Sequence, residues 1–154
     1  MRVEYINPFV EAAFDVLKEV LHTDIHRGEL FLKSATQSVL GVAAIVGLAG
    51  DVEGRVLFDM SAETAIEVAS VMNDEKFTSV DDMVKATITE LANMITAQAV
   101  TKLHELGFKF DLTPPAIFTG ENMEVTDTEV EALIVPVNLP MGKLEINVAV
   151  RERA

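Results

Sequence analysis

Apolar residues recur at intervals of three and four over residues 9–21, and this spacing predicts an amphipathic helix. Asn7 and Pro8 come just before this apolar run. Asn is a favourable N-cap, and Pro is tolerated at the first helical position, where its missing N–H has no partner within the helix. We therefore expect the first helix to begin at Asn7 and Pro8 and to end between Thr23 and Gly28.

Three segments after this helix have the patterns of strands. Residues 29–33 form a short segment, residues 39–48 are apolar on both faces, as in a central strand, and residues 52–60 follow a turn at residues 49–51. Because short turns separate these segments, we expect them to pair in chain order as a β-meander.

Two helices are expected next. Ser61 is a favourable N-cap for a helix over residues 62–72. Ser79 followed by Asp82 resembles a capping box, which predicts that a longer helix opens there. Gly107 is the natural stop for this second helix, since glycine adopts the left-handed conformation at helix ends.

The last third of the chain returns to strand patterns, separated by an acidic loop at residues 121–131. Four extended segments are expected: residues 108–112, 116–119, 132–137 and 144–150, the last two as a hairpin. Both halves thus have a helix followed by a meander, which suggests a weak internal duplication. The predicted fold class is α/β in the loose sense (α+β), a largely antiparallel sheet covered by helices, with residues 1–154 as a single domain.

Charge and composition narrow the functional classes. The chain has 25 acidic and 12 basic residues and a formal net charge of −13, which argues against binding to nucleic acid or to an anionic membrane surface. The absence of Cys excludes disulfides, thiolate catalysis and Cys-based zinc sites. The sequence has neither the apolar core of a signal peptide nor a membrane span, so we expect a cytoplasmic protein without membrane insertion.

The long predicted helix has an unusual outer side. At 100° per residue, a core stripe collects Val80, Val84, Thr87, Ile88, Leu91 and Ile95, and a strip pointing away from it collects Ala86, Glu90, Asn93 and Ala97, with Met83, Met94 and Thr101 at its margin. Over residues 83–101 the only charged residues are Lys85 and Glu90, whereas exposed helix faces usually carry many charges. Either another element of this chain or a partner is therefore expected to cover the strip.

Glu90 and Asn93 are three residues apart, so both side chains leave the helix in one patch. A carboxylate can pair with Lys or Arg, and a carboxamide can accept from water while donating to a phosphoryl oxygen. Hydrolysis of a phosphoryl group depends mostly on positioning and on charge stabilisation. The pair therefore has the chemistry to hold a partner and to place a water molecule.

The segment Glu90-Leu91-Ala92-Asn93-Met94, followed by Gly107 and by Asp111-Leu112-Thr113-Pro114-Pro115, resembles the CheC/CheX/FliY phosphatase family of bacterial chemotaxis, and most of all its CheX members. Residues 47–55 and 61–65 resemble the same family, so the resemblance covers nearly the whole chain. It implies a phosphatase that hydrolyses the aspartyl-phosphate of a CheY-type response regulator, in a homodimeric protein.

The resemblance also implies roles for individual residues. Glu90 would pair with the active-site Lys of the receiver, and Asn93 would enter the receiver's site and orient the attacking water. The partner would also contact Met83, Ala86, Met94 and Ala97. Mg²⁺ would belong to the receiver, and this chain would hold no cofactor of its own.

One departure from the family pattern keeps alternatives open. Family members often carry Asp or Ser one turn before the Glu, where this chain has Ala86. The same fold could therefore serve as a non-catalytic module that docks a receiver or a flagellar switch component. A third alternative is that the helix face is only a dimer interface.

A metal site is not expected. His22 and His26 have a spacing that can hold zinc on a helix, but they straddle the predicted end of the first helix. His104 lies near the end of the long helix, where histidine is favourable to the helix dipole. The acidic loop lacks the ligand spacing of a calcium-binding EF-hand.

Overall fold

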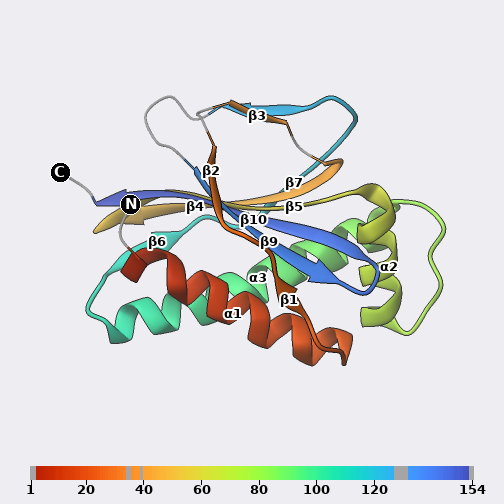
Figure 1. The fold of residues 1–154 in the computed structure, drawn as a ribbon, viewed down its shortest axis with the longest axis horizontal. Helices are drawn as coiled ribbons and strands as arrows, with labels where there is room; N and C mark the ends of the chain where they lie inside the picture. The colour runs from red at the N-terminus through yellow and green to blue at the C-terminus, as the bar shows by residue number, and fades with distance from the viewer. Residues whose placement is uncertain (1–2, 34–35, 39, 127–131, 153–154) are drawn as a thin grey trace.

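The computed structural model describes residues 3–33, 36–38, 40–126 and 132–152 (Figure 1). Its helices are α1 (Val3–Leu21), α2 (Ala62–Asn73) and α3 (Asp82–Glu105). Its strands are β1 (His26–Arg27), β2 (Phe31–Lys33), β3 (Thr36–Ser38), β4 (Val42–Gly50), β5 (Val52–Met60), β6 (Phe110–Leu112), β7 (Ala116–Thr119), β8 (Glu124–Thr126), β9 (Ala132–Leu139) and β10 (Gly142–Glu152).

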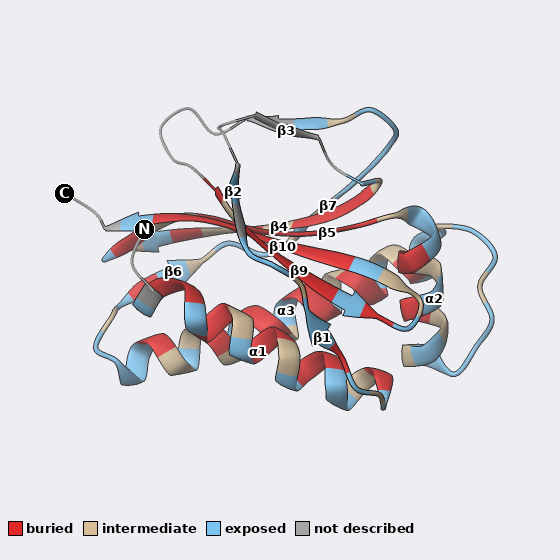
Figure 2. Cartoon of the chain, in the orientation of Figure 1, coloured by how far each residue is buried: buried red, intermediate tan, exposed pale blue. Residues whose placement is uncertain are grey.

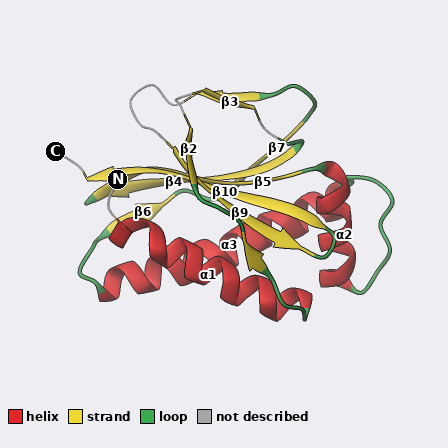
Figure 3. Ribbon diagram, viewed as in Figure 1, coloured by secondary structure: helices red, strands yellow, loops and turns green. Residues whose placement is uncertain are grey.

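A sheet of eight strands forms the centre of the molecule. Its order is β1-β9-β10-β5-β4-β6, with β2 also pairing with β9 and β7 also pairing with β4. All of these pairs are antiparallel. Figure 3 shows the three helices on one side of this sheet and β3, which pairs with β8 in a small second sheet, on the other. The predicted fold class, a largely antiparallel sheet with helices, is confirmed.

The predicted meander is wrong for its first strand. β4 and β5 form the expected hairpin, in which Ile45 lies opposite Leu57. β2 instead pairs with β9, where Phe31 lies opposite Ile134. The reason is that β6 and β7, from the second half of the chain, occupy the other edge of β4. The first strand therefore finds its partner about 100 residues away rather than next in sequence.

The predicted start of α1 is also wrong, because the helix begins at Val3 and contains Pro8. Tyr5 and Ile6, which precede the proline, are buried, and the Tyr5 ring packs edge-on against Phe108 with centroids 5.0 Å apart. Burying a large apolar side chain contributes about 1.5–3 kcal/mol. Two such side chains offset the single helical hydrogen bond that Pro8 cannot make to Glu4.

The C-terminal hairpin is confirmed, with longer strands than expected. β9 and β10 meet at a tight turn in which Gly142 lies opposite Leu139. The predicted acidic loop is only partly described: residues 124–126 form β8, and residues 127–131 lie outside the described residues.

The hydrophobic core lies between the large sheet and the helices. Figure 2 shows buried positions running along the central strands of the sheet. Among the largest fully buried side chains are Phe9 and Leu17 of α1, Phe58 of β5, Ile88 and Ile95 of α3, and Ile146 of β10. Among the described residues, no helix is both long and apolar enough to cross a membrane.

Candidate functional site on helix α3

The outer side of α3 presents a continuous row of exposed residues. This row, called the exposed strip below, consists of Met83, Ala86, Glu90, Asn93, Ala97 and Thr101. Met83 is the most apolar of them, with 51% of its surface exposed. Met94, expected at the margin of this strip, is instead half-buried and packs against the core. Within the described part of the chain, no other element covers the strip.

The opposite side of α3 is buried, which fixes the direction of the exposed strip. Val84, Thr87, Ile88, Leu91 and Ile95 of the predicted core stripe are buried as expected, and Val80, just before the helix, is half-buried. The buried side is wider than predicted, because Ala92, Thr96, Ala99 and Leu103 are also buried. These residues include small ones, which the periodicity of large apolar side chains does not reveal.

The helix carrying the strip is capped at both ends. The Asp81 carboxylate, and not the predicted Ser79, is the N-cap and accepts from Val84 N–H at 2.9 Å. At the other end Phe108 N–H bonds the Leu103 carbonyl at 3.1 Å, and Gly107, at φ +95°, bonds the His104 carbonyl at 3.0 Å. These two bonds form a Schellman motif, so the predicted stop at Gly107 is confirmed.

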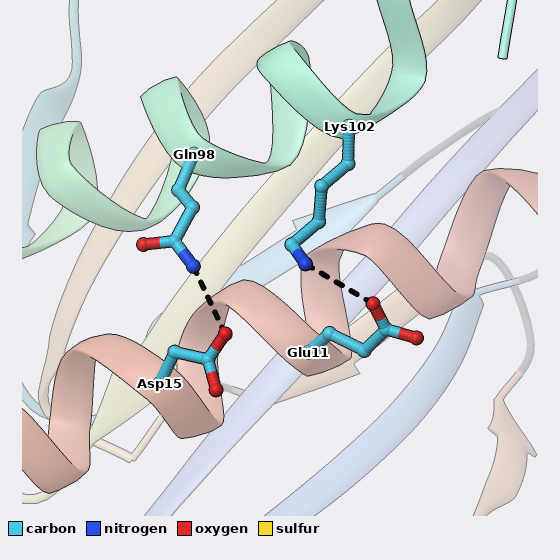
Figure 4. Close-up of polar contacts among 4 residues, drawn as sticks. All are labelled: Glu11, Asp15, Gln98 and Lys102. Carbon is cyan, nitrogen blue, oxygen red and sulfur yellow. Dashed lines mark hydrogen bonds and ion pairs between the residues drawn. The ribbon is translucent and has the colours of Figure 1, made fainter. Parts of the chain in front are cut away.

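Two polar contacts join α3 to α1 along one flank (Figure 4). Gln98 Nε2 donates to Asp15 Oδ2 at 3.1 Å, and Lys102 Nζ lies 3.3 Å from Glu11 Oε2. Figure 4 shows both α3 side chains extending toward the carboxylates of α1. Donors from α3 therefore engage two acidic groups of α1 and help to hold the two helices side by side.

Glu90 and Asn93 lie in the middle of the exposed strip. No hydrogen bond or ion pair of either side chain occurs within the described residues, so the carboxylate and the carboxamide are open to an incoming group. The positions that flank them on the strip, Ala86 and Ala97, bear only methyl groups, which allow the backbone of a partner to come close. The arrangement can bind a cation at Glu90 and a water molecule or phosphoryl oxygen at Asn93.

The histidines considered in the sequence analysis lie on separate elements of the structure. His22 follows α1 with a left-handed φ of +52°, and His26 lies in β1, so the two do not share a helix face. The His104 ring packs edge-on against Phe110. Over the part of the chain that the structure describes, no three His, Cys, Asp or Glu side chains come together as a metal site.

Comparisons with known proteins point to one family. The family model of CheX, described as chemotaxis phosphatase CheX, matches residues 42–138. The CheY-P phosphatase CheX of Thermotoga maritima is 25% identical over 126 residues, which cover 81% of each chain. This match and the family model both include the exposed strip.

Solved structures agree over almost the full length. CheX in the CheX–CheY–BeF3–Mg²⁺ complex from Borrelia burgdorferi is 49% identical, with a TM-score of 0.85 and coverage of 98% of this chain and 100% of that one. A CheC-like superfamily protein from a Shewanella species has a TM-score of 0.89 at 26% identity, with coverage of 98% and 99%.

Proposed function

This chain belongs to the CheX family of chemotaxis phosphatases, and we propose that it hydrolyses the aspartyl-phosphate of a CheY-type response regulator. The observation that carries this proposal is the uncovered strip on α3, where Glu90 and Asn93 are exposed and have no partner among the described residues. A relative with half of its residues identical to this chain forms a complex with CheY. A second relative is named a CheY-P phosphatase.

In the proposed mechanism, Asn93 is the catalytic residue. Its carboxamide would enter the receiver's site, accept a hydrogen bond from the attacking water and hold that water in line with the phosphorus. The phosphoryl group then passes from the aspartyl oxygen to water, which leaves a free carboxylate on the receiver and inorganic phosphate. Positioning of this kind is the main contribution that a protein makes to phosphoryl transfer.

Glu90 is the proposed anchor. Its carboxylate would pair with the active-site Lys of the receiver and thereby align Asn93 with the phosphoryl group. Met83, Ala86 and Ala97 would pack against the receiver on either side of this pair, and Met94 would support the strip from its half-buried position. The small side chains permit close approach, and Met adapts its shape to a partner surface.

We assign Mg²⁺ to the receiver rather than to this chain. The Borrelia complex contains CheY, BeF3 and Mg²⁺, and the described residues of this chain do not bring together a metal-binding set of their own. Bound at the receiver, Mg²⁺ supplies charge stabilisation for the phosphoryl oxygens. Removing Mg²⁺ is therefore expected to stop the reaction without changing the fold of this chain.

We further propose a cytoplasmic homodimer that pairs through a sheet edge. β1 and β2 lie at one edge of the large sheet, and Leu32 in β2 is 61% exposed there, with Leu30 beside it at 38%. Exposed leucines on an edge strand favour pairing with a second chain. Light scattering should report a dimer, and Leu32→Lys should shift it toward the monomer; a wild-type monomer would refute this assignment.

The function is tested by following the decay of a phosphorylated CheY-type receiver in Mg²⁺ with and without this protein. We expect faster decay with the wild type and loss of that acceleration with Asn93→Ala, while Asn93→Ala still binds the receiver. Unchanged decay together with binding would instead support the non-catalytic docking module that the alanine at position 86 leaves open. If several receivers show neither accelerated decay nor binding, both the phosphatase and the docking module are refuted.

A further inference from the structure

Thr96 lies on the buried side of α3, one turn beyond Asn93. It is only 1% exposed. Its Oγ1 donates to the Ala92 carbonyl oxygen at 2.8 Å and shares the same hydrogen with the Asn93 carbonyl oxygen at 3.3 Å. The hydroxyl therefore connects the two backbone carbonyls of the turn that carries the Asn93 side chain.

The surroundings of Thr96 explain why this bond is made. Ala92 and Ala99, the residues four before and three after it, are fully buried small side chains. Small side chains let a helix approach its neighbours closely, and α3 packs against α1, α2, β4 and β7. A hydroxyl group as deeply buried as that of Thr96 needs a partner, because leaving it unsatisfied is costly. A hydroxyl that bonds back to the preceding turn also bends the helix locally.

We propose that Thr96 is a positioning residue, which sets the height and tilt of the turn that presents Asn93 to the receiver. This inference rests on the proposed function, since the orientation of Asn93 matters only if its carboxamide places the attacking water. Displacing a positioning group by about 1 Å can cost about a hundredfold in rate. The smaller shift that follows from releasing one shared hydrogen bond should cost less.

The inference is tested by a pair of variants that separate the hydroxyl from the methyl group. Thr96→Val keeps the volume of the side chain and removes the hydroxyl, whereas Thr96→Ser keeps the hydroxyl and leaves a small void. Thr89→Val is the matched control, because the Thr89 hydroxyl makes the same kind of bond, to the Lys85 carbonyl at 2.8 Å. For each protein, kcat and KM are measured with a phosphorylated receiver, and Tm is measured by thermal unfolding.

We expect Thr96→Val to lower kcat about five- to tenfold with KM unchanged. Thr96→Ser should retain wild-type kcat although its Tm is lower, and Thr89→Val should resemble the wild type in kcat. If the role of Thr96 were purely structural, kcat would fall in parallel with Tm across the set. Positioning is identified if Thr96→Val has the lower kcat of the two Thr96 variants while Thr96→Ser has the lower Tm.

The contrary outcomes are distinct. Unchanged kcat in Thr96→Val, an equal loss in Thr96→Ser, or an equal loss in Thr89→Val would overturn the inference while wild-type activity leaves the proposed function in place. A wild-type protein that does not accelerate receiver dephosphorylation would overturn the proposed function, and the role of Thr96 would fall with it.

Discussion

The Lys102 ammonium of α3 lies 3.3 Å from the Glu11 carboxylate of α1, one turn along from the hydrogen bond between Gln98 and Asp15. The two side chains of the ion pair are 32% and 60% exposed, so water screens their attraction. Pairs of this kind contribute about 0–1 kcal/mol. The packing of the two helices must therefore come mainly from the hydrophobic core that both of them enter.

The first prediction compares these two contributions. Lys102→Gln should lower the free energy of unfolding by less than about 1 kcal/mol. Ile95→Ala, which empties a fully buried position on the same helix, should lower it by about 2–5 kcal/mol. Urea denaturation of both variants measures the difference. A loss in Lys102→Gln as large as that in Ile95→Ala would mean that polar contacts hold α1 against α3.

The second prediction concerns the N-terminus of α3. Asp81→Ala removes the carboxylate that accepts from Val84 N–H and should cost about 1 kcal/mol in the free energy of unfolding. Ser79→Ala is the matched control and should be nearly neutral, because the Ser79 carbonyl, not its side chain, accepts the Asp81 N–H. Equal losses in the two variants, measured by urea denaturation, would place the cap at both residues.

The candidate site could be predicted from sequence to a greater extent than the fold around it. The buried stripe and the exposed strip of α3 depend on the periodicity of a single helix, which a sequence displays directly. Pairing between strands depends on which edges are free, and nothing local to residues 29–33 shows that β9 is their partner. Sequence patterns therefore do not reveal which distant strands compete for the same edge of the sheet.

The errors at the ends of helices have local causes. Ser79 and Asp81 are both favourable caps two residues apart, so composition alone could not choose between them. Pro8 usually marks a first turn, but the burial of Tyr5 and Ile6 extends α1 beyond it. At α1, tertiary packing thus selected one of several local solutions.

The third prediction concerns Gly54 of β5, which lies opposite Val150 of the paired strand β10. Its φ is +138°, and a Cβ added there would clash with the Ala149 carbonyl group. Gly107 also has a positive φ, but a Cβ there would meet no atom within 4 Å. Gly107→Ala should therefore lower the free energy of unfolding by about 1 kcal/mol, through backbone strain alone. Gly54→Ala should lower the free energy of unfolding further, because β5 or β10 must move to accommodate the added methyl group. Similar Tm values for the two variants would contradict the steric explanation.

The fourth prediction addresses Glu90. Glu90→Lys reverses the charge proposed to meet the receiver's active-site Lys, so both binding and turnover should weaken. Juxtaposed like charges at an interface cost several kcal/mol, and we expect KM to rise at least about tenfold. Asn93→Ala serves as the contrast, since it should lower kcat with little effect on binding. Unfolding curves should overlay with the wild type because both positions are exposed.

A receiver with its active-site Lys changed to Glu completes this test. Glu90→Lys should bind that receiver better than the wild-type protein does, since the pair is then restored with exchanged charges. If Glu90→Lys leaves KM unchanged with both receivers, the carboxylate is not an anchor and its assignment to the site is wrong.

The fifth prediction concerns Ala86, which lies on the exposed strip one turn before Glu90. Ala86→Asp adds a carboxylate on the side of Glu90 that is remote from Asn93, and it should lower KM a few-fold by strengthening attraction to the receiver's Lys while kcat stays constant. Ala97→Asp is the control, because it places the same charge one turn beyond Asn93. The phosphoryl group would repel that charge, so KM should rise.

Both variants are compared at low and at high salt, since screening should reduce both changes in KM. Changes of KM in the same direction for the two variants would show that the strip responds only to total charge, and would contradict the proposed pairing of Glu90 with the receiver's Lys and of Asn93 with the phosphoryl group.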